Sequence, residues 1–223
     1  MIGDADVTTY VDQGFLVVPD LVETELVAEL YDEVERFRRG QYPVTNAAEV
    51  GDADGILAVH FPHWVSEPAA RAVTHSGIAA VLGRITGAHL PHWDGRVKCM
   101  QSMLFLKPPG FPGQAWHQDE RFIATRDRSL VGAWIALDPA TRANGCLWVV
   151  PGSQRTGRLW PTRPHDRPDE FDPTDEAHGF DDTDAVAVEV EPGDVVFFNG
   201  YLLHRSMRNR SEHTRRALVN HYM

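Results

Sequence analysis

The chain has 223 residues, 43% of them hydrophobic, and a formal net charge of −11 at pH 7. That length and apolar content suit one domain, residues 1–223, with a sizeable core. The acidic balance argues against nucleic acid as a partner, because binding it requires clustered positive charge that displaces counterions.

The N-terminal residues 1–6 are acidic and lack the basic and then apolar pattern of a signal peptide. No apolar run approaches the length needed to cross a bilayer. We therefore expect a cytoplasmic protein without a membrane partner, and nothing in the sequence indicates its oligomeric state.

Two helices are predicted in the first part of the chain. Asp20 with Glu23 offers a capping box, after which apolar residues recur at helical spacing until Gly40. A second helical stretch is expected over 68–85, with a break near 76–77. Between the two helices, the segment 42–66 contains histidines and aromatic residues that suit a cavity mouth.

Short apolar runs follow from residue 96, separated by Gly, Pro and Asn turns. They cover 97–106, 115–119, 130–137, 146–150, 185–190, 195–198 and 217–222. This spacing predicts a mainly β fold with flanking helices and a double-stranded β-helix (jelly roll, cupin-like) core. The helical part should cover about 1–95 and the core about 96–223.

The run 97–106 alternates along a strand, so its odd-numbered residues should share one face. These residues are Cys99, Gln101, Met103 and Phe105. If that face lines a cavity, the Gln101 amide can hydrogen-bond a ligand there, although a satisfied core amide is an equal alternative. Cys99 and Cys146 lack metal-site spacing and are expected to be free thiols.

His117 and Asp119, together with His204 far downstream, offer two imidazoles and one carboxylate. This donor set is the facial triad that holds non-haem Fe(II) and leaves coordination positions open. His117 follows a loop rich in Gly and Pro, so we expect a strand on which His117 and Asp119 face the same side. A second His-x-Asp pair, His92 with Asp94, lies between a Pro and an Asp-Gly turn and is interpreted as structural.

Around His204, apolar strands at 195–198 and 216–222 are expected to form a hairpin that returns His204 to the metal. Arg215 would then lie deeper in the same cavity, where its guanidinium can hold a carboxylate through two hydrogen bonds. Ser206 should share the face of His204 and donate to that carboxylate. The other arginines nearby are interpreted as a solvated face: Arg205, Arg208, Arg210 and Arg216.

These motifs resemble the phytanoyl-CoA dioxygenase family of Fe(II)- and 2-oxoglutarate-dependent oxygenases over nearly the whole chain. The matching pieces are 14–19, 103–109, 116–119, 133–137, 144–147, 151–153 and 193–217. The resemblance implies that His117, Asp119 and His204 bind iron, and that Arg215 and Ser206 hold the distal carboxylate of 2-oxoglutarate. Met103 and Trp134 match family positions that line the co-substrate site.

The resemblance further implies a dioxygenase that uses O2 and releases succinate and CO2. The expected reaction is hydroxylation or oxidative cyclisation of a small polar metabolite, as in secondary-metabolite biosynthesis. Hydroxylation is favoured over halogenation, because relatives that halogenate have a small residue at the position of Asp119. The alternatives are a cupin-type isomerase or hydrolase that uses Zn or Mn as Lewis acid, and a non-catalytic jelly-roll binding module.

The segment 159–184 is long for a connection and rich in Pro and acidic residues. It is either a solvated, mobile charge run or a lid that attracts a cationic or polyhydroxylated substrate. These two interpretations remain open from the sequence.

Overall fold

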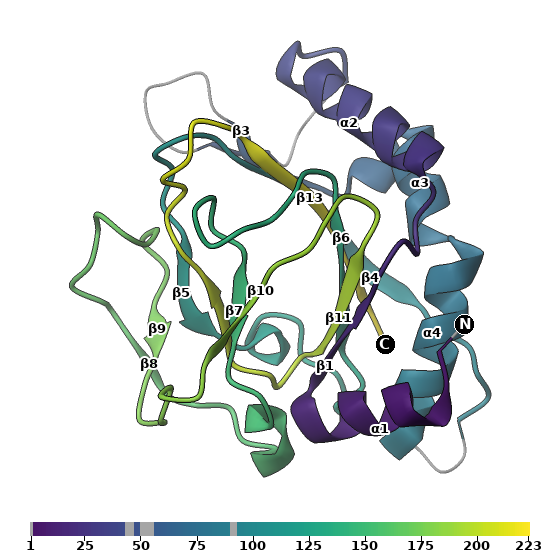
Figure 1. The fold of residues 1–223 in the computed structure, drawn as a ribbon, viewed down its shortest axis with the longest axis vertical. Helices are drawn as coiled ribbons and strands as arrows, with labels where there is room; N and C mark the ends of the chain where they lie inside the picture. The colour runs from purple at the N-terminus through teal and green to yellow at the C-terminus, as the bar shows by residue number, and fades with distance from the viewer. Residues whose placement is uncertain (1, 43–46, 50–55, 90–92) are drawn as a thin grey trace.

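The computed structural model describes residues 2–42, 47–49, 56–89 and 93–223. Two antiparallel β-sheets form the centre of the molecule, and the helices cover one side of it (Figure 1). This arrangement confirms the mainly β jelly-roll fold with flanking helices. Within the described residues, every helix is too short or too polar to cross a bilayer.

The larger sheet has seven strands in the order β1-β11-β6-β13-β4-β3-β2. Their bounds are β1 Phe15–Val18, β2 Ala47–Glu49, β3 Ile56–His60, β4 Cys99–Lys107, β6 Val131–Ala136, β11 Val195–Asn199 and β13 Arg215–Tyr222. Three of these strands come from the first 95 residues, which therefore contribute to the sheet as well as to the helical layer.

The smaller sheet has four strands in the order β10-β7-β12-β5. Their bounds are β5 Gln114–His117, β7 Leu147–Val149, β10 Val186–Val188 and β12 His204–Ser206. A separate pair, β8 (Thr162–Arg163) with β9 (Glu176–Ala177), lies within the long acidic segment. Short 3-10 turns complete the fold at η1 Pro62–Trp64, η2 Thr86–His89, η3 Asp119–Arg121 and η4 Ser153–Thr156.

Over the described ranges, four helices flank the larger sheet: α1 Asp4–Gln13, α2 Thr24–Arg38, α3 Glu67–Val73 and α4 Ser76–Ile85. The two predicted helices are found, and the second is broken before residue 76 as expected. The predicted capping box is absent, because Asp20 lies outside α2 with φ 49° and the side chain of the N-cap residue Glu23 makes no capping hydrogen bond to the helix. Helix α1 was not predicted.

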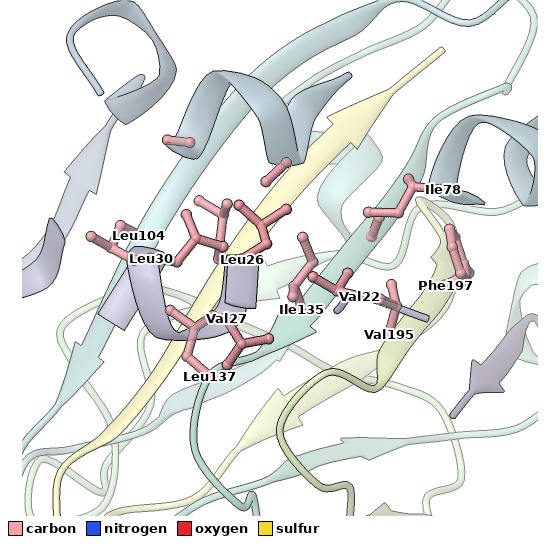
Figure 2. Close-up of a cluster of buried hydrophobic side chains, with 14 of the residues drawn as sticks. Val22, Leu26, Val27, Leu30, Ile78, Leu104, Ile135, Leu137, Val195 and Phe197 are labelled. Atoms are coloured by element: carbon pink, nitrogen blue, oxygen red, sulfur yellow. The ribbon is translucent and has the colours of Figure 1, made fainter. Parts of the chain in front are cut away.

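Apolar side chains fill the space between the helices and the larger sheet. Figure 2 shows Leu26 and Leu30 of α2 packed over this sheet, near Leu104 and Ile135. A second apolar cluster lies on the other face of the sheet. Because both faces are covered, strand β11 is apolar at successive positions rather than at every second one.

The predicted hairpin of the strands at 195–198 and 216–222 is wrong. Strand β6 lies between β11 and β13 in the larger sheet, and the intervening strand β12 belongs to the smaller sheet. The chain crosses from one sheet to the other and back, as a jelly roll requires. His204 and Arg215 consequently approach the cavity from opposite sheets.

Candidate functional site

The two histidines of the predicted triad lie on neighbouring strands of the smaller sheet. His117 ends β5 and is the direct cross-strand partner of His204 on β12. The Nδ1 atom of His117 lies 2.8 Å from the Ala115 carbonyl, and that of His204 lies 3.0 Å from the Leu202 carbonyl. With each Nδ1–H donated to a carbonyl, the two Nε2 atoms are left to face the third member.

That third member is Asp119, whose Oδ1 lies 3.6 Å from Nε2 of His117 and 3.5 Å from Nε2 of His204. The prediction that Asp119 lies on the same strand as His117 is wrong, because Asp119 begins the turn η3. Gln118 between them keeps an extended backbone (φ −134°, ψ 125°), so the alternation of sides continues for one residue beyond β5. His117 and Asp119 therefore face the same space.

His221, on β13, supports the Asp119 carboxylate and was missed in the sequence. Its Nε2 lies 2.8 Å from Oδ2 of Asp119, so one carboxylate oxygen faces the two histidines and the other is held by His221. Burial opposes ionisation of Asp119, but His204 and His221 outweigh it and hold the pKa of this carboxyl well below its ordinary value. Counting in steps of two from Arg215 along β13 would have identified His221.

The donor set fits a divalent metal ion. Among the described residues, His117, Asp119 and His204 form a group whose ligand atoms all lie within 4.8 Å of one another. Burial, together with the neighbouring His204, lowers the pKa of His117 to about 3, so its imidazole is neutral. Two imidazole nitrogens and one carboxylate suit non-haem Fe(II) and leave positions open for further ligands.

The triad opens into a cavity of about 320 Å³ between the two sheets. All of the predicted site residues line it: Gln101, Met103, His117, Asp119, Trp134, His204, Ser206 and Arg215. Its other walls are largely apolar, with Phe105 and Val219 on the larger sheet and Leu147 on the smaller one. The cavity has room for a small molecule beside a metal.

Arg215 begins β13 and is buried, with 4% of its surface exposed. Its guanidinium carbon lies 5.4 Å from the Trp134 ring centroid, and Nη2 makes a long contact of 3.4 Å with the Gly145 carbonyl. Among the described residues, no carboxylate oxygen lies within 4 Å of it, and its Nε has no hydrogen-bond partner. Burial lowers its pKa to about 10, which still leaves the guanidinium charged near neutral pH.

Lys107, the last residue of β4, is a second buried basic residue that the sequence prediction missed. It lines the cavity beside Ser206 and is the cross-strand partner of Arg215. The expected alternation over Gln101, Met103 and Phe105 is found, and one further step of two reaches Lys107. This strand therefore presents residues from the metal end of the cavity to the Arg215 end.

The prediction that Cys99 shares the cavity face of its strand is wrong. The pairing of β4 with β13 shifts between His221 and Tyr222, so the alternation is broken before Gln101 and Cys99 packs on the helical side. Gln101 does face the cavity, where its amide nitrogen lies 3.3 Å from Nδ1 of His60. Both cysteines are free, as expected.

The acidic segment 159–184 packs against the core and forms ion pairs with arginines. Glu170 pairs with Arg210, and Asp182 accepts a hydrogen bond from the Trp116 indole and lies near Arg205. The sequence suggested only a solvated face for these arginines, but Arg205 and Arg210 also pair with acids of this segment. Asp172 is the acid of this segment that lines the cavity.

The second His-x-Asp pair is described only in part, because His92 lies outside the described residues. Asp94 is exposed, and its Oδ1 accepts a hydrogen bond from the Arg96 backbone nitrogen, as in a local turn.

A family model for phytanoyl-CoA dioxygenase matches residues 10–217 of the chain. A phytanoyl-CoA dioxygenase of Arabidopsis thaliana is 37% identical over 123 residues, which is 55% of this chain and 43% of that protein. The chain spans about half the length of the first curated relatives it matches.

Solved structures with the same fold include EctD from S. alaskensis with bound Fe. That likeness has a TM-score of 0.78 at 20% identity and covers 99% of this chain and 76% of EctD. The epimerase SnoN from nogalamycin biosynthesis, in complex with Fe3+, alpha ketoglutarate and nogalamycin RO, matches with a TM-score of 0.75 at 21% identity. That match covers 99% of this chain and 82% of SnoN. At these identities the likeness is one of fold.

Proposed function

The chain belongs to the phytanoyl-CoA dioxygenase family, and we propose that it is an Fe(II)- and 2-oxoglutarate-dependent dioxygenase that oxidises a small molecule. One observation carries the proposal: the His-Asp-His donor set lines the same cavity as a buried guanidinium that contacts no carboxylate among the described residues. One end of the cavity thus suits a metal ion, and the other end suits a carboxylate.

In this proposal His117, Asp119 and His204 hold the iron. When bound, iron supplies the activation of O2 that couples loss of CO2 from 2-oxoglutarate, leaving succinate, to oxidation of the substrate. The protein's own contribution at this end is positional. Carbonyls fix both imidazole rings, and His221 holds the Asp119 oxygen that faces away from the histidines.

At the other end Arg215 and Ser206 hold the distal carboxylate of 2-oxoglutarate. A guanidinium can bind a carboxylate through two hydrogen bonds, and burial strengthens such a contact because little water competes for it. Trp134 lies beneath the guanidinium, while Met103 and Gln101 line the space between Arg215 and the metal end. Apolar walls exclude water from the space where the co-substrate would react.

We further propose that the substrate is a small polar metabolite and that the reaction is hydroxylation or oxidative cyclisation. The volume of the cavity supports a small molecule. Two structures with the same fold also support it, since SnoN was crystallised with nogalamycin RO and EctD with 5-hydroxyectoine. Asp172 and Gln101 give the cavity wall polar groups that suit a cationic or polyhydroxylated compound.

The test is anaerobic addition of Fe(II) and 2-oxoglutarate to the purified protein, followed by visible absorption. We expect a weak metal-to-ligand charge-transfer band, which His117→Ala should abolish while the protein remains folded by circular dichroism. His92→Ala is the control and should retain the band. A protein that binds the metal without giving the band would instead support a Lewis-acid isomerase or hydrolase, and failure to bind metal would support a binding module.

A further inference from the structure

The amine of Lys107 is enclosed at the Arg215 end of the cavity. The residue is 5% exposed, and its Nζ donates to Oγ of Ser206 and to the carbonyl of Met207, each at 2.8 Å. Gly145 packs against it closely, since a Cβ at that position would lie 3.0 Å from Nζ. The position of the amine is therefore fixed by its surroundings.

Lys107 contacts no carboxylate in the part of the chain that the structure describes. Among the described residues, no carboxylate oxygen lies within 4 Å of Nζ, and Arg215 across the strand pair is in the same situation. The nearest acids act on Lys107 only from beyond contact distance: Glu170 pairs with Arg210, and Oδ1 of Asp172 accepts a hydrogen bond from the Thr174 nitrogen. The remaining titratable neighbour is the Cys146 thiol, whose pKa burial raises to about 11, so it brings no negative charge near neutral pH.

Two buried cations without a carboxylate in contact are costly, and a buried amine relieves the cost by losing its proton. The guanidinium of Arg215 does not do so near neutral pH, whereas an amine does. Burial first, and then the charge of Arg215, lower the pKa of Lys107 well below its ordinary value. The hydrogen bonds agree, because a neutral amine has two N–H groups and Lys107 has two acceptors.

We propose that Lys107 is a second cation for the distal carboxylate of 2-oxoglutarate, and that its amine takes up one proton from solvent when that carboxylate enters. Protonation adds a third N–H to the amine, and this N–H donates a hydrogen bond to the incoming carboxylate. The bound anion also supplies the negative charge that the pair of Lys107 and Arg215 lacks. This inference rests on the proposed function, because it assumes that 2-oxoglutarate is the ligand at this end.

The sign of the pH effect follows from the two states of the amine. Below the pKa of Lys107 in the free protein, the amine is already charged and binding takes up no proton at this site. Between that value and the higher pKa of Lys107 in the complex, each binding event takes up one proton from solvent. The affinity for 2-oxoglutarate then falls by about tenfold per pH unit as the pH rises. The effect should therefore appear as a loss of 2-oxoglutarate affinity on the alkaline side.

The experiment is anaerobic calorimetry of 2-oxoglutarate binding to the Fe(II)-loaded protein in buffers of different ionisation enthalpy over a pH series. We expect uptake that approaches one proton per ligand. 2-Oxobutyrate, which keeps the keto acid and lacks the distal carboxylate, should bind without this uptake. Lys107→Met should lose both the uptake and the alkaline fall in affinity, whereas Lys107→Arg should lose the uptake and retain the binding.

Equal proton uptake for 2-oxoglutarate and 2-oxobutyrate would overturn the inference, and this comparison needs only the unaltered chain. Binding of 2-oxoglutarate with no uptake at any pH would also overturn it, while leaving the proposed function in place. If 2-oxoglutarate does not bind at all, the proposed function fails and the inference fails with it.

Discussion

The inner end of the cavity, where Arg215 and Lys107 lie, differs from the mouth of the cavity in the elements that form it and in how its charges are balanced. The inner end is formed by β4, β6 and β13, central strands of the larger sheet whose two faces are both covered. The mouth lies beside Phe122, which follows the turn η3 and is 61% exposed, and the acidic segment 159–184 contributes Asp172 to the cavity wall.

The charges follow the same division. At the inner end, Arg215 and Lys107 are buried, and neither contacts a carboxylate of the described residues. In the acidic segment, Glu170 and Glu176 are paired with arginines. Uncompensated buried charge points to a ligand, because a protein gains nothing in stability from leaving it unpaired. The inner end therefore identifies the chemistry of its ligand, and the mouth does so only weakly.

The largest effect is expected at the inner end, from Arg215→Ala. Loss of a charge-assisted contact of roughly 1.5–3 kcal/mol should lower 2-oxoglutarate affinity by about ten- to a hundredfold, with little change in iron affinity. Titration of the charge-transfer band with each component measures both. Arg216→Ala is the matched control, because Arg216 pairs with Asp138 at 2.9 Å and is not among the residues that line the cavity. Equal losses in the two variants would contradict the assignment to Arg215.

Much of this inner end could be predicted from the sequence, because its signals are local. A continuous apolar run bounded by turns predicted a strand at 130–137, and β6 covers 131–136. Alternation predicted that Gln101 and Met103 face the cavity, and it would also have predicted Lys107 and His221 had it been extended along both strands.

The failures came where the structure depends on contacts between residues distant in sequence. The shift in pairing between β4 and β13 that turns Cys99 to the helical side has no local signal. The crossing of β12 to the smaller sheet is set by pairing with β5 and β7. Likewise, the arginines after residue 204 looked solvated because their acidic partners lie far earlier in the chain, as Glu170 does for Arg210.

A smaller effect is expected at the metal end, from His221→Phe. This change removes the donor to Oδ2 of Asp119 and keeps a ring of similar size, so the carboxylate loses its orientation but remains a ligand. With Co(II) as the probe in place of Fe(II), metal affinity should fall by about tenfold, which is the lower end of the range for residues that support a metal ligand. Competition with a chelator measures this affinity, and thermal unfolding of the metal-free protein shows whether the fold is intact.

His60→Phe is the control for the metal end, because His60 lines the same cavity and contacts Gln101 rather than Asp119. If His60→Phe lowers Co(II) affinity as much as His221→Phe does, the effect belongs to the cavity in general and not to the Asp119 contact.

The smallest effect is expected from Asp172→Asn, on the wall that the acidic segment contributes to the cavity. Screening a metabolite panel for substrate-stimulated succinate formation would first identify the substrate. If it is cationic, losing one partly exposed carboxylate at the cavity wall should lower kcat/KM at low salt by up to about fivefold, since such interactions contribute roughly 0.2–1 kcal/mol. The difference should shrink as salt screens the charge. Asp169→Asn is the control, because that residue is exposed in the same segment and does not line the cavity. Unchanged kcat/KM in Asp172→Asn would leave the uncharged wall around Gln101 to determine specificity, and equal losses in both variants would indicate general attraction by the segment.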